Sequence, residues 1–233
     1  MIPVIQWLIK KIQIWWRESR PANRLFEGIA CQSEACRIFV RDFYIDRDSK
    51  LISFEPRVGV GYVPNVLELL PDADGRAVAS ILNILGQVGK TEEIEVIRMS
   101  QDTAGEWNSH VFVIGGQSNK SYDFYRSMEN VAYRMDDQNM YDAATDQRIR
   151  VEQGFGYGII LKALNPFKTG GKRGIGFLIA GFGAFGTKVA TYYFREHFLQ
   201  LGKEFGRDCF GILVRASVTA GEQAVERLDS KRF

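Results

Sequence analysis

The sequence predicts an α/β protein built on a three-layer, Rossmann-like sheet, mostly parallel with one antiparallel hairpin and preceded by an N-terminal amphipathic helix. Short apolar runs alternate with helical patterns along residues 25–233, and two of these runs end in glycines directly before a helical pattern. No linker or repeat divides them. Strands that alternate with helices are typical of a parallel sheet with helices on both faces. We therefore expect a basic helix over residues 1–24 and a single α/β domain over residues 25–233.

Composition narrows the classes of function. The chain has 233 residues, of which 45% are apolar, so it can bury a substantial core. Its formal net charge is only +2 and its excess of cations lies near the N-terminus, so we expect no nucleic-acid partner. Three cysteines without a CxxC motif argue against a disulfide framework or a cysteine zinc site, and we expect a reducing cytoplasm. The two histidines share no metal-ligand spacing, and we expect no metal site.

Residues 1–20 read as an amphipathic helix. At helical spacing, one face gathers the apolar side chains Val4, Ile5, Leu8, Ile9, Ile12, Trp15 and Trp16. Lys10 and Lys11 interrupt the apolar run, which makes it too short for a transmembrane helix and unlike a signal peptide. Pro21 ends the pattern. Three interpretations remain open: the helix lies peripherally in a membrane interface, it docks on a protein partner or a second copy, or it packs on its own domain.

The first half of the domain begins with an alternating strand over residues 37–45, joined by a polar turn to a second strand over residues 50–54. A loop containing Gly59, Gly61 and Pro64 follows. Pro71-Asp72-Ala73-Asp74 is a helix-start signal, and we expect the helix to run to about Val88 and to end at Gly89. Strands are then predicted over residues 94–99 and 110–114, and a helix over residues 119–135.

The second half continues the alternation. Strands are predicted over residues 147–151 and 158–164, and a KTGGK turn at residues 168–172 leads to a strand over residues 175–180. A helical pattern then runs from Thr187 to about Leu201. The final unit is a strand over residues 210–216 followed by a helix over residues 220–228.

Gly181, Gly183 and Gly186 form a G-x-G-x-x-G motif between a buried strand and a helix. Strand, glycine turn and helix are the context in which this motif binds phosphate. Glycines let the backbone approach a ligand, and the helix start offers unpaired N–H groups at the positive end of the helix dipole. Thr187 would add a hydroxyl. The same glycines would also serve a tight turn without a ligand.

A second glycine loop follows the strand over residues 110–114. It reads Gly115, Gly116, Gln117, Ser118, Asn119 and Lys120, and a helical pattern begins at once. Gln117, Ser118 and Asn119 could bond a ligand, and Lys120 could reach a phosphate. In a doubly wound sheet, ligands bind beyond the carboxyl ends of strands. If the two strands are neighbours, both glycine loops open into one crevice.

The ligand expected there is a phosphorylated small molecule, with a nucleotide as the candidate cofactor. A dehydrogenase fingerprint expects an acid after the second strand, but no acid follows residues 210–216 until Glu222. The full Walker A pattern is also absent, because no Ser or Thr follows Lys172. The glycines thus fit phosphate without the rest of a dehydrogenase or P-loop pattern.

Three functions remain open. The preferred one is a binding module that holds its ligand between the glycine loops and meets a membrane surface or protein partner through residues 1–20. The first alternative is a nucleotide hydrolase or NAD-glycohydrolase that draws on a nearby acid, with the candidates Asp102, Glu106, Asp123 and Asp142. The second alternative is an assembly protein without a ligand, whose oligomers depend on Trp15 and Trp16.

Overall fold

The computed structural model describes residues 20–41, 43–46, 52–53, 66–69, 71–99, 105–116, 119–128, 130–136, 139–169 and 174–233. Apart from Arg20, the expected N-terminal helix over residues 1–20 lies outside the described residues. So do the loop glycines at positions 59 and 61, Pro64, and the candidate ligand-binding residues Gln117 and Ser118.

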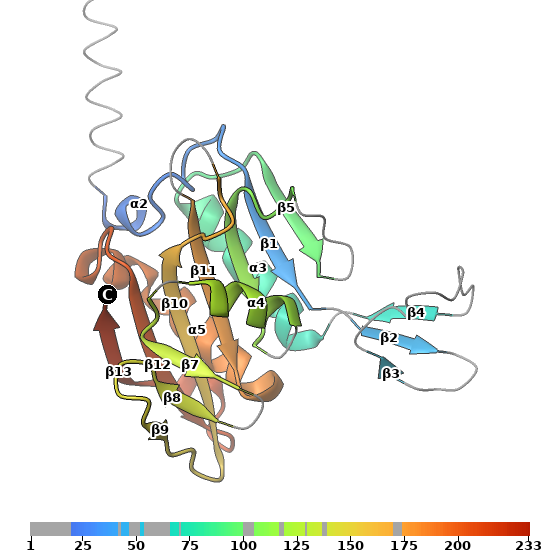
Figure 1. Ribbon diagram of the computed structural model, residues 1–233, viewed down its shortest axis with the longest axis vertical. Helices are drawn as coiled ribbons and strands as arrows, with labels where there is room; N and C mark the ends of the chain where they lie inside the picture. The colour runs from blue at the N-terminus through green and yellow to red at the C-terminus, as the bar shows by residue number, and fades with distance from the viewer. Residues whose placement is uncertain are drawn as a thin grey trace, which may run out of the picture.

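The described residues form a mixed sheet of seven strands, in the order β13-β12-β10-β11-β6-β1-β5 (Figure 1). Four neighbouring strands are parallel: β5 (Ile94–Arg98), β1 (Cys36–Val40), β6 (His110–Ile114) and β11 (Ile175–Gly181). The other three continue the sheet in antiparallel pairs: β10 (Phe155–Leu164), β12 (Phe210–Ser217) and β13 (Glu226–Arg232). The chain is therefore an α/β protein with a parallel core, and its antiparallel edge is larger than the single predicted hairpin.

One face of the sheet is covered by α3 (Asp72–Gln87) and α5 (Gly183–Glu204), with the short helix α2 (Pro21–Leu25) against α5 (Figure 1). Helix α3 buries a stripe at helical spacing that contains Ala77, Ile81, Ile84 and Leu85. Phe112 of β6 stacks on Phe177 of β11, with ring centroids 4.9 Å apart, beneath these helices.

The opposite face is covered by α4 (Asn119–Ser127) and by a small antiparallel sheet. That sheet contains β7 (Tyr133–Met135), β8 (Met140–Asp142) and β9 (Arg148–Ile149). Phe124 of α4 packs near Trp107, which stacks on Phe39 at 4.0 Å. The third layer is therefore part helix and part strand. A further small sheet, β3-β2-β4, lies between β1 and α3 along the chain and contains β2 (Phe43–Asp46), β3 (Ile52–Ser53) and β4 (Val66–Leu69).

Three sequence predictions were wrong in part. The helix expected over residues 119–135 ends at Ser127, because Tyr133 and Met135 are buried while Arg134 is exposed, which is the two-residue period of a strand. The helix expected over residues 220–228 is a single 3-10 turn, η1 (Glu222–Ala224), followed by the edge strand β13. The strand expected over residues 37–45 is divided between β1 and β2, which belong to different sheets.

Other elements match their predictions closely. The predicted strands at residues 94–99, 110–114, 158–164, 175–180 and 210–216 appear as β5, β6, β10, β11 and β12. Helix α3 spans the predicted range and is followed by Gly89 with a φ of 81°. Helix α5 begins at Gly183, four residues before the predicted start, so the last two glycines of the motif belong to the helix.

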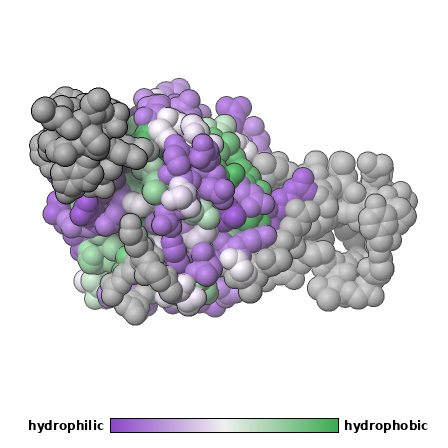
Figure 2. All heavy atoms as spheres, turned by 90° about the horizontal axis from the view of Figure 1, so that it is seen from above, coloured by the Kyte–Doolittle hydropathy of each residue, from purple (hydrophilic) through white to green (hydrophobic). Residues whose placement is uncertain are grey.

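Two further features concern the surface and the helices of the described residues. Hydrophilic residues dominate the described surface seen from above, with apolar residues in small patches among them (Figure 2). None of the helices in the described part of the chain combines the length and the apolar content needed to cross a membrane.

Candidate functional site

The two glycine loops lie side by side. Strands β6 and β11 are parallel neighbours, and the register pairs Val111 with Gly176 and Ile114 with Ile179. The backbone N–H of Gly115 donates to the carbonyl of Ile179 at 2.9 Å, so the pairing extends into the first loop. The two strands are therefore neighbours, which is the condition for both loops to share one crevice, and both loops begin at the same edge of the sheet.

Gly181 and Gly186 are required by packing. A Cβ on Gly181 would lie 2.2 Å from the carbonyl carbon of Gly186, and a Cβ on Gly186 would lie 2.3 Å from the carbonyl oxygen of Tyr157. Any side chain at either position would therefore overlap backbone. The pair lets the first turn of α5 rest directly on the ends of β10 and β11, which is the packing role of glycines in this kind of motif.

Gly183 differs from the other two glycines. It is exposed, has a φ of 59°, and no described atom beyond the adjoining backbone lies within 4 Å of the position that its Cβ would occupy. The residue before it, Phe182, caps the helix without a side-chain hydrogen bond. The first turn of α5 thus has N–H groups that no capping side chain satisfies, beside open space. This is the one glycine of the motif whose surroundings leave room for a ligand.

The remaining predicted residues have mixed roles. Thr187 is buried, and its hydroxyl donates to the carbonyl of Gly183 at 3.5 Å, within its own helix. Gly116 packs toward the opposite face, because a Cβ there would lie 1.9 Å from Cε of Met135. Asn119 and Lys120 begin α4, on the face of the sheet opposite α5, and only their backbone is described.

The space between the two loops is small. A cavity of about 10 Å³ lies among the described residues there, with a volume on the scale of one water molecule. Its walls include Arg41 after β1, Asp74 in α3, Gly115 and Gly116 after β6, and Gly181, Gly183 and Thr187 at the β11–α5 turn. A nucleotide does not fit between the loops in this conformation. A ligand would have to lie on their open side, over Gly183 and Ala184, which are both exposed.

Asp74 and Arg41 are charged residues of this region that the sequence analysis did not assign to the site, and Asp74 is the more buried of the two. It is only 2% exposed, and its Oδ2 makes no hydrogen bond to any described residue. Burial raises the pKa of its carboxyl to about 6, while the charge of Arg41 acts in the opposite direction. Asp74 lies three residues before Ala77, on the buried face of α3. This helical spacing is the feature of the sequence that could have predicted the burial of Asp74. Arg41, which follows a buried strand, carried no comparable signal.

An ion pair joins the N-terminal parts of the two long helices. Nζ of Lys188 in α5 lies 2.8 Å from Oδ2 of Asp72 in α3, and Nε of Arg76 lies 3.1 Å from Oδ1 of the same carboxylate. These two cations hold the pKa of Asp72 below its usual range through their hydrogen bonds. Two cations therefore share one carboxylate next to the exposed start of α5.

The acids proposed for the enzymatic alternative lie elsewhere. Asp142 pairs with Lys231 and accepts a hydrogen bond from the backbone N–H of Ala144. Asp123 is exposed on α4, and Glu106 precedes the amino end of β6. Asp102 lies outside the described residues. None of the three described acids lines the cavity between the loops. Nor does the described part of the chain contain a group of His, Cys, Asp and Glu side chains placed to hold a metal ion.

Comparisons with known proteins add no family. No protein-family model matches the chain, and no curated protein matches its sequence. The function must therefore be argued from the geometry of the site.

Proposed function

We propose that this protein binds a phosphorylated small molecule, with a nucleotide as the preferred class, and places the phosphate at the N-terminus of α5. The observation that carries the proposal is the exposed turn at Gly183 and Ala184, at the carboxyl end of a parallel strand. Helix starts of this kind bind anions through their free N–H groups and the positive end of the helix dipole. The parallel core of the sheet supplies the edge at which such ligands bind.

Of the charged side chains near this turn, one favours the binding of an anion and one opposes it. Lys188 lies in the second turn of α5 and can reach toward an anion, since it is 28% exposed. Asp74 opposes an anion, but its carboxylate lies under Gly115 and faces the charge of Arg41. A phosphate on the open side of the turn would meet the N–H groups of the helix start, whereas Asp74 is only 2% exposed. The hydrolase alternative gains no support from the described acids, because its candidates Glu106, Asp123 and Asp142 do not line the cavity and Asp74 is too buried to reach a ligand there.

Residues 1–20 complete the proposal. We propose that they couple the domain to a membrane surface or a protein partner in the cytoplasm, as their amphipathic pattern predicts. Deletion of residues 1–19 tests this part. The shortened protein should keep its thermal unfolding transition and lose sedimentation with anionic phospholipid vesicles. Sedimentation that persists after the deletion would contradict a membrane role for this segment.

The binding site is tested by thermal unfolding in the presence of mononucleotides, dinucleotides, cyclic dinucleotides and NAD(P). A ligand at about 100 times its Kd should stabilise the fold by about 2.7 kcal/mol. The decisive variants are Gly183→Asp and Gly183→Asn. Both side chains tolerate the left-handed conformation at this position, and they differ mainly in charge.

The expected result is that Gly183→Asp removes the ligand-induced shift while Gly183→Asn keeps most of it. That difference isolates electrostatic repulsion of a phosphate from any loss of folding. An equal shift in the wild type and in folded Gly183→Asp would place the ligand elsewhere. A well-folded wild type without a shift for any phosphorylated ligand would favour the assembly alternative.

A further inference from the structure

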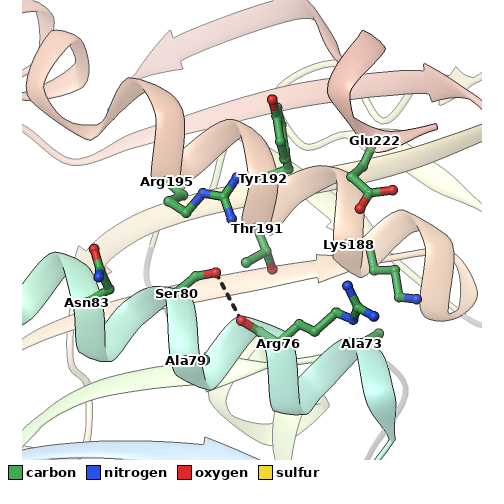
Figure 3. Close-up of a pocket in the computed structure, with 10 residues that line it drawn as sticks. All are labelled: Ala73, Arg76, Ala79, Ser80, Asn83, Lys188, Thr191, Tyr192, Arg195 and Glu222. Carbon is green, nitrogen blue, oxygen red and sulfur yellow. Dashed lines mark hydrogen bonds between the residues drawn. The ribbon is translucent and has the colours of Figure 1, made fainter. Parts of the chain in front are cut away.

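A second concave surface, the α3–α5 groove, lies on the outer side of the two long helices. Its volume is about 390 Å³, within the usual range of small-molecule sites and far larger than the cavity between the loops. Side chains of α3 and α5 line its length, and Glu222 of η1 closes one side (Figure 3). None of the predicted site residues lines it.

Cations stand at both ends of the groove. Arg76 and Lys188 share the carboxylate of Asp72 at one end, and Arg195 lies at the other (Figure 3). Lys188 and Arg195 are seven residues apart on α5, which separates their backbones by about 10 Å along the helix axis. Three cations and one carboxylate are the charged residues among the groove's lining side chains.

The cation at the far end is held in place. The guanidinium of Arg195 lies 4.9 Å from the centroid of the Tyr192 ring, and its Nε and one Nη each approach a Glu196 carboxylate oxygen at 2.9 Å. Arginine carries five N–H donors, so donors remain for a ligand after these contacts. A pre-positioned guanidinium loses less entropy when it binds an anion.

The floor of the groove contains a hydroxyl without a partner. Thr191 is 5% exposed, and its Oγ1 makes no hydrogen bond to any described residue. Figure 3 shows this oxygen on the side of α5 that faces α3. A buried hydroxyl that lacks a partner destabilises a fold, and a ligand group on the floor would supply one. The unpartnered hydroxyl of Thr191 therefore indicates a ligand-binding site, which the surface charges alone would not.

We propose that the α3–α5 groove binds a sugar bisphosphate, with one phosphate near Arg76 and Lys188, the other near Arg195, and the sugar over Thr191. The two cationic ends match two anionic groups separated by one sugar. Between them, Thr191 and Ser80 offer hydroxyls and Glu222 offers an acceptor for the sugar hydroxyls. This site has Lys188 in common with the one proposed at Gly183, but its other lining residues are distinct, and the proposal does not depend on ligand binding at Gly183.

The proposal is tested by isothermal titration calorimetry of the full chain at constant ionic strength, with fructose 1,6-bisphosphate, fructose 6-phosphate and fructose as probes. Fructose 1,6-bisphosphate should bind at least tenfold more tightly than fructose 6-phosphate, and fructose should not bind. Arg195→Gln and Thr191→Val should each weaken bisphosphate binding at least fivefold. The matched control is Arg134→Gln on β7, which removes the same charge on the opposite face of the sheet and should leave the affinity unchanged.

Thr191→Val should fold normally, because it replaces an unpartnered hydroxyl by a methyl group of similar size. Bisphosphate affinity that survives in either Arg195→Gln or Thr191→Val would overturn the proposal, as would equal weakening by Arg134→Gln or the absence of bisphosphate binding. Gly183→Asp separates the two sites. Retained bisphosphate binding in that variant supports an independent groove, whereas loss there places the bisphosphate at the start of α5 and overturns it.

Discussion

The carboxylate of Asp74 lies under the backbone of Gly115, with Oδ2 3.5 Å from the position that a Cβ on Gly115 would occupy. Gly115 has a φ of 82°, a conformation that other residues rarely adopt. The start of α3 and the end of β6 therefore meet through a buried acid and a glycine. An acid in such a place costs free energy when it is ionised, because burial separates its charge from water.

The stability of the protein should depend on the ionisation of Asp74. Its pKa in the folded state is about 6, above the ordinary value of 3.8, so ionisation penalises only the folded state. The protein should lose stability as the pH rises through the folded-state pKa. The loss attributable to Asp74 is about 2 kcal/mol between about pH 4.5 and about pH 7. Urea denaturation of the wild type and of Asp74→Asn at both pH values measures it.

The difference in the free energy of unfolding between the wild type and Asp74→Asn cancels the contributions of all other titrating groups, because both proteins share them. The free energy of unfolding of Asp74→Asn, relative to the wild type, should rise between the two pH values. A constant difference would show that the Asp74 carboxyl keeps its ordinary pKa in the folded state.

Gly183→Ala and Gly186→Ala should differ strongly in stability. The first has open space around its Cβ position and costs only the left-handed backbone, about 1–2 kcal/mol. The second lies within α5, where helix propensity favours alanine by about 1 kcal/mol. Its Cβ would nevertheless overlap the carbonyl oxygen of Tyr157, so a net loss of about 3 kcal/mol or more is expected. Urea denaturation measures both, and a stabilised Gly186→Ala would mean that α5 can move away from β10.

Lys90→Met should destabilise the fold by about 2–3 kcal/mol. Lys90 is 1% exposed, and its Nζ donates to the carbonyls of Cys31, Gln32 and Glu34 at 2.8, 3.0 and 2.6 Å. Methionine preserves the length of the side chain but leaves three carbonyls without this donor. Lys203→Met, at an exposed position of α5, removes the same charge and should leave the chemical denaturation midpoint nearly unchanged. Equal effects of the two substitutions would exclude a role for these hydrogen bonds.

The three cysteines should react with a maleimide at very different rates. Cys31 is exposed, and a hydrogen bond with Ser33 lowers the pKa of its thiol, which favours the reactive thiolate. Burial raises the pKa of Cys36 to about 12 and also raises the pKa of Cys209. Mass spectrometry of the labelled native protein should find Cys31 modified first, Cys209 later, and Cys36 only after denaturation. Early labelling of Cys36 would indicate that β1 opens in the native state.

The sequence predicts the core of the sheet well because the strands β6, β10, β11 and β12 are continuous apolar runs. Such runs are typical of strands that are covered on both faces. The same reasoning missed β13, which lies at the edge of the sheet, because its residues are mostly charged and exposed. Edge strands often carry charges that discourage pairing with other chains, and these charges hide the strand pattern.

The sequence predicted which elements precede and follow the two glycine loops, but not the role of each glycine within them. The sequence placed each glycine loop after an apolar strand and left open whether the two strands are neighbours, which the structure shows they are. The separate roles of Gly181, Gly183 and Gly186 could not be predicted, because they depend on how closely α5 approaches the backbone of β10. The groove that joins Arg76 to Arg195 also depends on how two helices, 96 residues apart at their closest ends, pack together.

Helix α5 makes close backbone contacts with the rest of the fold near both of its ends. Near its start, Gly186 lies against Tyr157, and near its finish a Cβ on Gly202 would lie 2.1 Å from the carbonyl oxygen of Pro21. Backbone meets backbone at both points, about 24 Å apart along the helix axis. The helix can therefore neither slide by a turn nor roll about its axis without opening one of these contacts. These two contacts fix the position of α5 relative to β10 and α2. We therefore expect a conformational change that accompanies function to involve other segments and to leave α5 in place.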